Sequence, residues 1–194
     1  MIARAAAAAL SVVAAACQLA ASAPRIESDG RVAMGTVLDV QLGVAGARSA
    51  RADLDASFAI VADLEALVSH YDPASEVSRL SATSGSGPQR VDARVVELVR
   101  ASLRHAELSS GAFDPTLGQL VELWGRETPE SAVYEDVARA REHTGVDALR
   151  VLADDTVEVA RAGVKLDFGG IAKGWALDRV RADFDRRGVG PVLL

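Results

Sequence analysis

The chain of 194 residues has little of several residue types that whole functional classes require. Its single cysteine, Cys17, excludes an internal disulfide and a thiolate metal site. Its three histidines, His70, His105 and His143, lie far apart and lack the spacing of metal ligands. Each histidine is therefore expected on a surface or a helix face, and no Ser-His-Asp triad is assigned.

An excess of positive charge is also absent. The net charge is −6 at pH 7, and the basic residues are scattered singly along the sequence instead of forming a cluster. Nucleic acid is therefore not an expected partner, because proteins that bind it gather lysine and arginine into a patch. Lys165 and Lys173 are the only lysines among many arginines. Composition alone gives no reason for a lysine at position 173, which makes it a candidate functional residue.

Long hydrophobic runs that would span a membrane are missing, and the apolar stretch over residues 5–16 is too short. Residues 1–23 combine Arg4, this stretch and small residues, which is the pattern of a secretory signal peptide. Cys17 stands where a lipoprotein signal places its acylated residue; an ordinary cut near Ala23 is the alternative. We therefore expect export, to the periplasmic side of the inner membrane if Cys17 is lipidated and to the periplasm otherwise.

After a polar linker over residues 24–30, residues 31–194 are expected to form one domain of mixed helices and strands. Residues 31–42, rich in β-branched side chains, predict the first strand. Ser49 is expected to cap a helix whose apolar residues recur at helical spacing. Further expected elements are a helix capped by Asp92, helices over 117–124 and 135–144, a hairpin of 148–152 with 156–159, a strand over 164–168, a helix over 171–187, and a last strand at 191–194, with Trp124 and Trp175 in the core.

The strongest local signal for chemistry lies at residues 166–174, where a glycine pair separates an expected strand from a helix. Two glycines let backbone come close to a ligand, and a helix N-terminus offers N–H groups to a phosphate. Lys173 would add a cation there, and Asp167 would accept hydrogen bonds from a ring edge. Neither the Walker loop nor the dinucleotide fingerprint matches this segment. A tight turn in which Asp167 serves only as a cap is the alternative.

A second signal lies at residues 111–116, where an aromatic side chain and a carboxylate precede a proline. Phe113 would cover a flat ring, and Asp114 would bond its polar edge. A plain Asp-Pro turn with Phe113 in the core is the alternative. Tyr71 precedes a similar Asp-Pro pair with the same alternative, and Met34 by itself indicates packing within a strand.

Together and in this order, the motifs resemble those of the ApbE family of FAD:protein FMN transferases. The resemblance extends from about Arg31 to the last residue, and four ordered motifs are far more specific than any one of them. They are residues 34–36 (Met-Gly-Thr), residues 69–73 (Ser-His-Tyr-Asp-Pro) with 75–80, residues 111–118 with 123–125, and residues 166–174.

The resemblance implies an α+β fold in which helices pack on a largely antiparallel mixed sheet. It implies a Mg²⁺ ion that binds the backbone carbonyl of Gly170 beside the diphosphate of FAD. The residues that it implies as FAD contacts are Met34, Tyr71, Ala112, Phe113, Asp114, Asp167 and Lys173.

The resemblance also implies the reaction. A threonine hydroxyl of a target protein attacks the phosphorus of the FMN half of FAD, and AMP leaves, with Mg²⁺ required. The target would be a protein such as a flavin-bearing subunit of a membrane redox complex. No residue of this chain is assigned a catalytic role.

Members of the resembled family continue beyond a strand like that at residues 192–194, into further FAD contacts and metal-binding side chains. We therefore expect the domain over residues 31–194 to be incomplete at its C-terminal side. Two alternative functions follow from this expectation. One is a periplasmic protein that binds a flavin without transferring it, and the other is an inactive remnant of a transferase.

Overall fold

The structure, a computed structural model, describes residues 25–46, 48–125 and 134–194. The predicted signal peptide over residues 1–23 lies outside them. The chain divides into two compact units, unit 1 from residues up to Val61 together with Leu177–Leu194, and unit 2 from Ala62–Ala176. No helix in the described ranges has the length and apolar character needed to cross a membrane.

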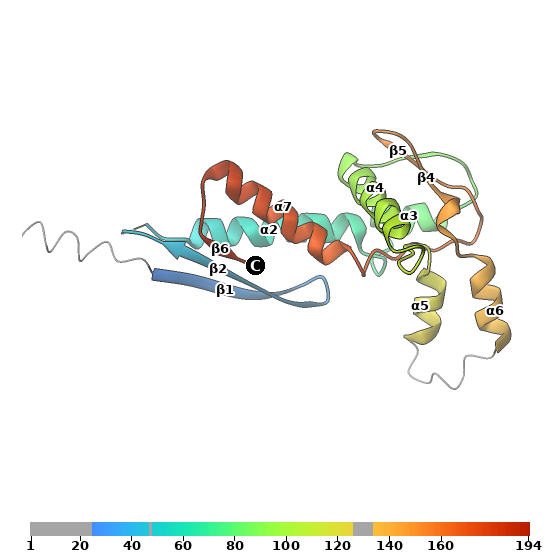
Figure 1. Ribbon diagram of the computed structural model, residues 1–194, viewed down its shortest axis with the longest axis horizontal. Helices are drawn as coiled ribbons and strands as arrows, with labels where there is room; N and C mark the ends of the chain where they lie inside the picture. Colours follow the sequence, from blue (N-terminus) through green and yellow to red (C-terminus); the bar gives the residue numbers. More distant parts are fainter. Residues whose placement is uncertain (1–24, 47, 126–133) are drawn as a thin grey trace, which may run out of the picture. The chain divides into compact units, whose positions relative to one another are not determined.

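Unit 1 is built on an antiparallel hairpin of β1 (Arg25–Ala33) and β2 (Thr36–Val44). The short strand β6 (Val192–Leu193) pairs with β2 and completes a three-stranded antiparallel sheet in the order β1-β2-β6 (Figure 1). The single strand predicted over residues 31–42 is therefore wrong, because a two-residue turn divides it. The hairpin also begins at Arg25, inside the segment expected to be a polar linker.

The turn of this hairpin explains the error. Met34 and Gly35 both have positive φ angles, of 50° and 73°. Such a pair matches the right-handed twist of the flanking strands, but the usual sequence signal is Asn-Gly or Asp-Gly. Because methionine rarely adopts this conformation, the residue types at positions 34 and 35 gave no sign of a turn.

The core of unit 1 lies between β2 and the parts of two helices that belong to the unit, α2 (Arg51–Val68) and α7 (Ala172–Arg187). Asp53, only 4 % exposed, lies at the start of α2. Its carboxylate accepts a hydrogen bond from Arg187 Nη1 at 2.6 Å and forms a second ion pair with Arg48. The buried apolar side chains of this core include Val40, Leu42, Val44, Leu54, Phe58, Val61, Val180 and Phe184.

Unit 2 is mainly helical and contains a second three-stranded antiparallel sheet, in the order β3-β5-β4. Its longest complete helix, α4, begins after the capping residue Asp92, whose side chain accepts a hydrogen bond from Arg94 N. The elements of unit 2 are α3 (Glu76–Ala82), β3 (Gln89–Arg90), α4 (Ala93–Leu108), α5 (Gly118–Trp124), α6 (Tyr134–Glu142), η2 (Val146–Ala148), β4 (Leu149–Ala153) and β5 (Thr156–Val159), besides the end of α2 and the start of α7.

The α+β class with antiparallel sheets is confirmed, as are the predicted helices and the hairpin of β4 with β5. The strand predicted over residues 164–168 is wrong: only Lys165 makes a bridge, an isolated parallel one to Leu117. Trp175 is buried as expected, but Trp124 is 62 % exposed, so the prediction that it fills the core is wrong. The short elements α3 and β3 were not predicted.

Candidate functional site

Unit 2 contains all but one of the predicted ligand-binding residues. Met34 is the exception, because it lies in the β1–β2 turn of unit 1, where it is half-buried. The others come from the end of α2, from the loop before α5 and from the segment that leads into α7.

The loop before α5 and the segment before α7 run side by side. Asp167 N donates to Pro115 O at 2.8 Å, and Gly118 N donates to Lys165 O at 3.0 Å. These bonds take the place of the strand pairing expected for residues 164–168. They bring the two strongest sequence motifs, which are separated by about fifty residues, into one place.

A further contact between the two motifs is that of Phe113 with Gly170. A Cβ atom placed on Gly170 would lie 3.2 Å from Phe113 Cε2, so the aromatic ring lies directly against the glycine backbone. Phe113 is half-buried, and Gly170 is exposed. The glycine is thus needed for close approach and not for an unusual backbone angle.

Asp114 is held in a rigid turn. Its Oδ1 accepts hydrogen bonds from Thr116 N at 2.8 Å and from Thr116 Oγ1 at 2.6 Å. Thr116 is fully buried, and its Oγ1 also accepts a hydrogen bond from Gly145 N at 2.7 Å. The Asp-Pro turn is therefore present, and it fixes the position of the carboxylate next to Phe113.

Asp167 has the capping bond that one interpretation of its motif predicts. Its Oδ1 accepts a hydrogen bond from Gly169 N at 2.7 Å, in the turn that leads into α7. The same oxygen lies 3.6 Å from His70 Nδ1. The side chains of Asp167 and His70 are only 12 % and 15 % exposed, so this approach is largely shielded from water.

Tyr71 follows His70 and is 83 % exposed. The two rings contact each other, with centroids 3.8 Å apart and planes inclined at 41°. An exposed tyrosine that packs on a neighbouring ring presents a flat apolar surface to a ligand. Sequence reasoning missed His70, although its place directly before Tyr71 in the second motif was a usable signal.

A cleft of about 420 Å³ adjoins this pair of rings. His70 and Tyr71 form part of its wall, and polar side chains of α3 and α5 form other parts. Lys165 in the same wall is paired with Glu122. The polar residues from α3 and α5 that line the cleft are Ser78, Ser81 and Gln119.

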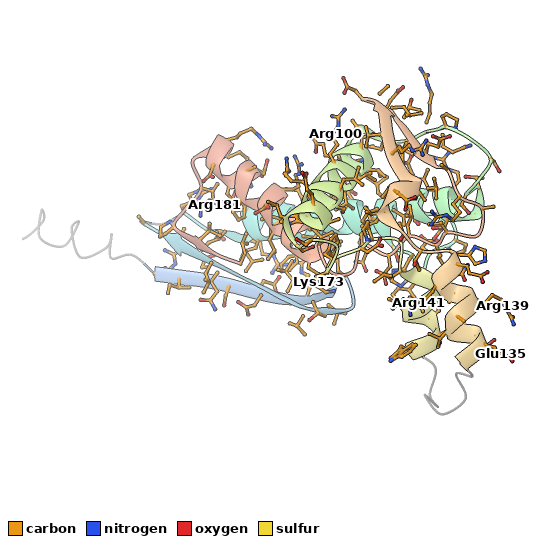
Figure 2. The ribbon with its side chains drawn as sticks, turned by 45° about the vertical axis from the view of Figure 1, so that its right-hand side comes forward. Arg100, Glu135, Arg139, Arg141, Lys173 and Arg181 are labelled. Atoms are coloured by element: carbon orange, nitrogen blue, oxygen red, sulfur yellow. The ribbon has the colours of Figure 1, made fainter. Side chains whose placement is uncertain are left out.

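Lys173 lies in the first turn of α7, where Figure 2 labels it, and its side chain is exposed. No ion pair with any residue in the described ranges engages it. Because no acidic side chain of the described residues pairs with this ammonium group, it suits a phosphate ligand. Ala112 is also exposed.

Among the described residues, no group of three or more histidine, cysteine, aspartate or glutamate side chains could hold a metal ion. The predicted ligand, the Gly170 carbonyl, is a single oxygen. Mg²⁺ prefers six oxygens in near-octahedral geometry. The described residues therefore do not form a magnesium site by themselves.

Comparison with known proteins gives a consistent picture. The sequence profile of the ApbE family matches residues 34–194. The FAD:protein FMN transferase of Treponema pallidum is 34 % identical over 142 residues, which are 69 % of this chain and 39 % of that protein. That of Rhodobacter capsulatus is 33 % identical over 188 residues, which are 91 % of this chain and 34 % of that protein.

Solved structures agree with the fold. The flavin transferase ApbE from Vibrio cholerae has a TM-score of 0.81 at 23 % identity, over 88 % of this chain and 56 % of that one. The apo form of the Pseudomonas stutzeri flavinyl transferase ApbE has a TM-score of 0.78 at 30 % identity, over 88 % of this chain and 55 % of that one. The chain thus spans about half the length of these structures, and less than half of the two transferases above. The profile match over residues 34–194 places the chain in the ApbE family.

Proposed function

We propose that the protein transfers FMN from FAD to a threonine hydroxyl of a target protein and releases AMP. The observation that carries the proposal is the contact of Phe113 with Gly170, which unites the two strongest motifs in unit 2. Membership of a family whose named relatives are FAD:protein FMN transferases supports the same activity.

The predicted FAD contacts of unit 2, here called the cluster, offer a separate group for each part of FAD. They are Tyr71, Ala112, Phe113, Asp114, Asp167 and Lys173. Phe113 and Tyr71 provide apolar faces for the flat ring systems. The carboxylates of Asp114 and Asp167 accept hydrogen bonds from polar ring edges or ribose hydroxyls. Lys173 provides a cation for the diphosphate. Ala112, which has no side-chain polar atom, contributes exposed backbone.

The transfer itself is a substitution at phosphorus. The threonine oxygen forms a bond to the phosphorus of the FMN half, and the bond from that phosphorus to the bridging oxygen breaks. AMP leaves with the bridging oxygen, and the hydroxyl proton passes to a base or to water. The described residues serve this step by binding and orienting FAD, and none of them is assigned as the base.

Three finer parts of the proposal rest on the resemblance alone. One is a dependence on Mg²⁺, for which Gly170 would give one ligand and the diphosphate and water would give others. Another is the target, a protein such as a flavin-bearing subunit of a membrane redox complex. The third is export to the periplasm, either free or anchored through a lipid on Cys17.

A second candidate function is flavin binding without transfer. It is favoured by the finding that no group of three or more histidine, cysteine, aspartate or glutamate side chains that could hold a metal ion occurs in the described part of the chain. The two functions share the same site and differ only in whether the bond at phosphorus is broken.

One experiment separates the two functions. The 194-residue chain is incubated with FAD, Mg²⁺ and a threonine-containing acceptor protein, and AMP release is followed with the mass of the acceptor. Transfer predicts AMP and flavinylated acceptor in equal amounts, both lost with EDTA and reduced in Asp167→Ala. The matched control is Asp154→Ala, because that carboxylate is 96 % exposed at the tip of the β4–β5 hairpin. Bound FAD without release of AMP favours the second function. If neither FAD binding nor AMP release is detected, both functions are contradicted.

A further inference from the structure

His70 stands between two residues that the proposed function requires. Its ring packs against the Tyr71 ring at 3.8 Å between centroids, and its Nδ1 lies 3.6 Å from Asp167 Oδ1. Its side chain is 15 % exposed, so most of its surface is used in contacts with the protein. The proposed function uses both of these residues but gives no role to His70.

The short helix α3 fixes the backbone on both sides of this arrangement. At its N-terminal end, Ser75 Oγ and Ser78 Oγ donate to the carbonyl of Ser69, at 2.6 and 3.3 Å, directly before His70. Near its C-terminal end, Ser81 Oγ accepts a hydrogen bond at 3.0 Å from Leu166 N, directly before Asp167. The histidine and the aspartate are thus both anchored to one helix of unit 2.

The separation of 3.6 Å is slightly longer than a hydrogen bond. A small rotation of either side chain closes it. With the contact closed and a proton on Nδ1, Asp167 Oδ1 would accept hydrogen bonds from both His70 and Gly169 N. Two donors on one oxygen would fix the plane of the carboxylate.

We propose that His70 is a positioning residue that orients the Asp167 carboxylate and supports the Tyr71 ring for flavin binding. The inference rests on the proposed function, since it assumes that FAD occupies this cluster. It assigns His70 no role in the bond that breaks. Support of a ligand-binding group by a neighbouring donor is a general requirement for a precise site.

Two substitutions separate the donor from the ring. His70→Phe keeps an aromatic ring against Tyr71 but removes the donor to Asp167, and we expect its Kd for FAD to rise about tenfold. His70→Asn keeps a donor close to the place of Nδ1 but removes the ring against Tyr71, so we expect it to recover part of the affinity that His70→Ala loses. The same substitutions at His105, which is exposed on α4, are the matched controls and should leave the Kd unchanged.

A double-mutant cycle tests whether His70 acts through Asp167. In an Asp167→Ala background, His70→Phe should have no further effect on the Kd, because the carboxylate that it positions is gone. Affinities are measured by equilibrium titration of flavin fluorescence, and thermal melts report whether each variant folds. If His70→Phe does not fold, the comparison of His70→Asn with His70→Ala decides the same question.

The outcomes are distinct. Wild-type chain that shows no saturable FAD binding contradicts the proposed function, and the role of His70 with it. Wild-type binding that is unchanged in His70→Phe contradicts the role of His70 alone. An effect of His70→Phe that persists in full in the Asp167→Ala background, or a loss in His70→Asn equal to that in His70→Ala, also overturns the inference.

Discussion

Replacing Gly170 by alanine tests the contact on which the site is built. The added Cβ would lie 3.2 Å from Phe113 Cε2, whereas carbon atoms in ordinary contact are about 3.5 to 4.0 Å apart. The ring must therefore retreat by about 0.5 Å, an amount that a half-buried side chain accommodates at a cost below about 1 kcal/mol in the free energy of unfolding.

The effect on ligand binding should be larger than the effect on stability. If the Phe113 ring covers the flavin, as proposed, a displacement of about 0.5 Å loses part of the stacking contact, and we expect the Kd for FAD to rise about 5- to 10-fold. The assay is a titration of FAD fluorescence at fixed protein concentration, accompanied by a thermal melt of each variant.

Gly174 provides the matched control within the same motif. A Cβ placed there meets nothing within 4 Å, and the residue lies in the first turn of α7. Gly174→Ala should therefore leave the Kd unchanged and raise stability by about 0.5 kcal/mol, because alanine favours a helix over glycine. Equal affinities in Gly170→Ala and wild-type chain, or equal losses in both alanine variants, would refute the reasoning.

Three further predictions concern the two units separately. Hydrogen bonds from the Arg94 side chain and backbone N–H lower the pKa of Asp92 from 3.8 to about 2. The contribution of the Asp92 carboxylate to stability is therefore complete above about pH 4 and is lost as the pH falls through 2. Asp92→Ala should thus destabilise the chain by about 1 kcal/mol in urea at pH 7 and by much less at pH 2. Asp53→Ala should cost about 1 to 2 kcal/mol in the same assay, because two part-exposed arginines lose a charged hydrogen-bond acceptor; a loss below about 0.5 kcal/mol contradicts this. Lys173→Ala should weaken FAD binding about tenfold at low salt and less at high salt, while Arg141→Ala, also an exposed cation of unit 2, should not; equal losses in both contradict a specific phosphate contact.

The helices of the fold could be predicted because their signals are local. Asp92 caps α4 through its own backbone neighbours, and the apolar spacing up to Val68 matches the buried face of α2. The hairpin in unit 1 could not, because its turn uses Met34 in a conformation that methionine rarely adopts. The conformational preference of methionine gave no sign of the positive φ angle at Met34.

The candidate site shows the same division. The motifs around Phe113 and Asp167 were visible as residue types in order, but their contact depends on hydrogen bonds between distant segments. Residues 164–168 resemble a strand in sequence, yet their backbone bonds go to Pro115 and to the hydroxyl of Ser81. His70 was visible in the second motif directly before Tyr71, but its approach to Asp167 depends on the tertiary structure.

The most direct test of the central claim is an equilibrium titration of the 194-residue chain with FAD, in parallel with Asp167→Ala and the control Asp154→Ala. If the residues around Phe113 and Asp167 bind FAD, the titration shows saturable binding that Asp167→Ala weakens at least about tenfold and that Asp154→Ala leaves unchanged. Absence of saturable binding, or equal affinity in wild-type chain and Asp167→Ala, would contradict the claim that this cluster binds FAD.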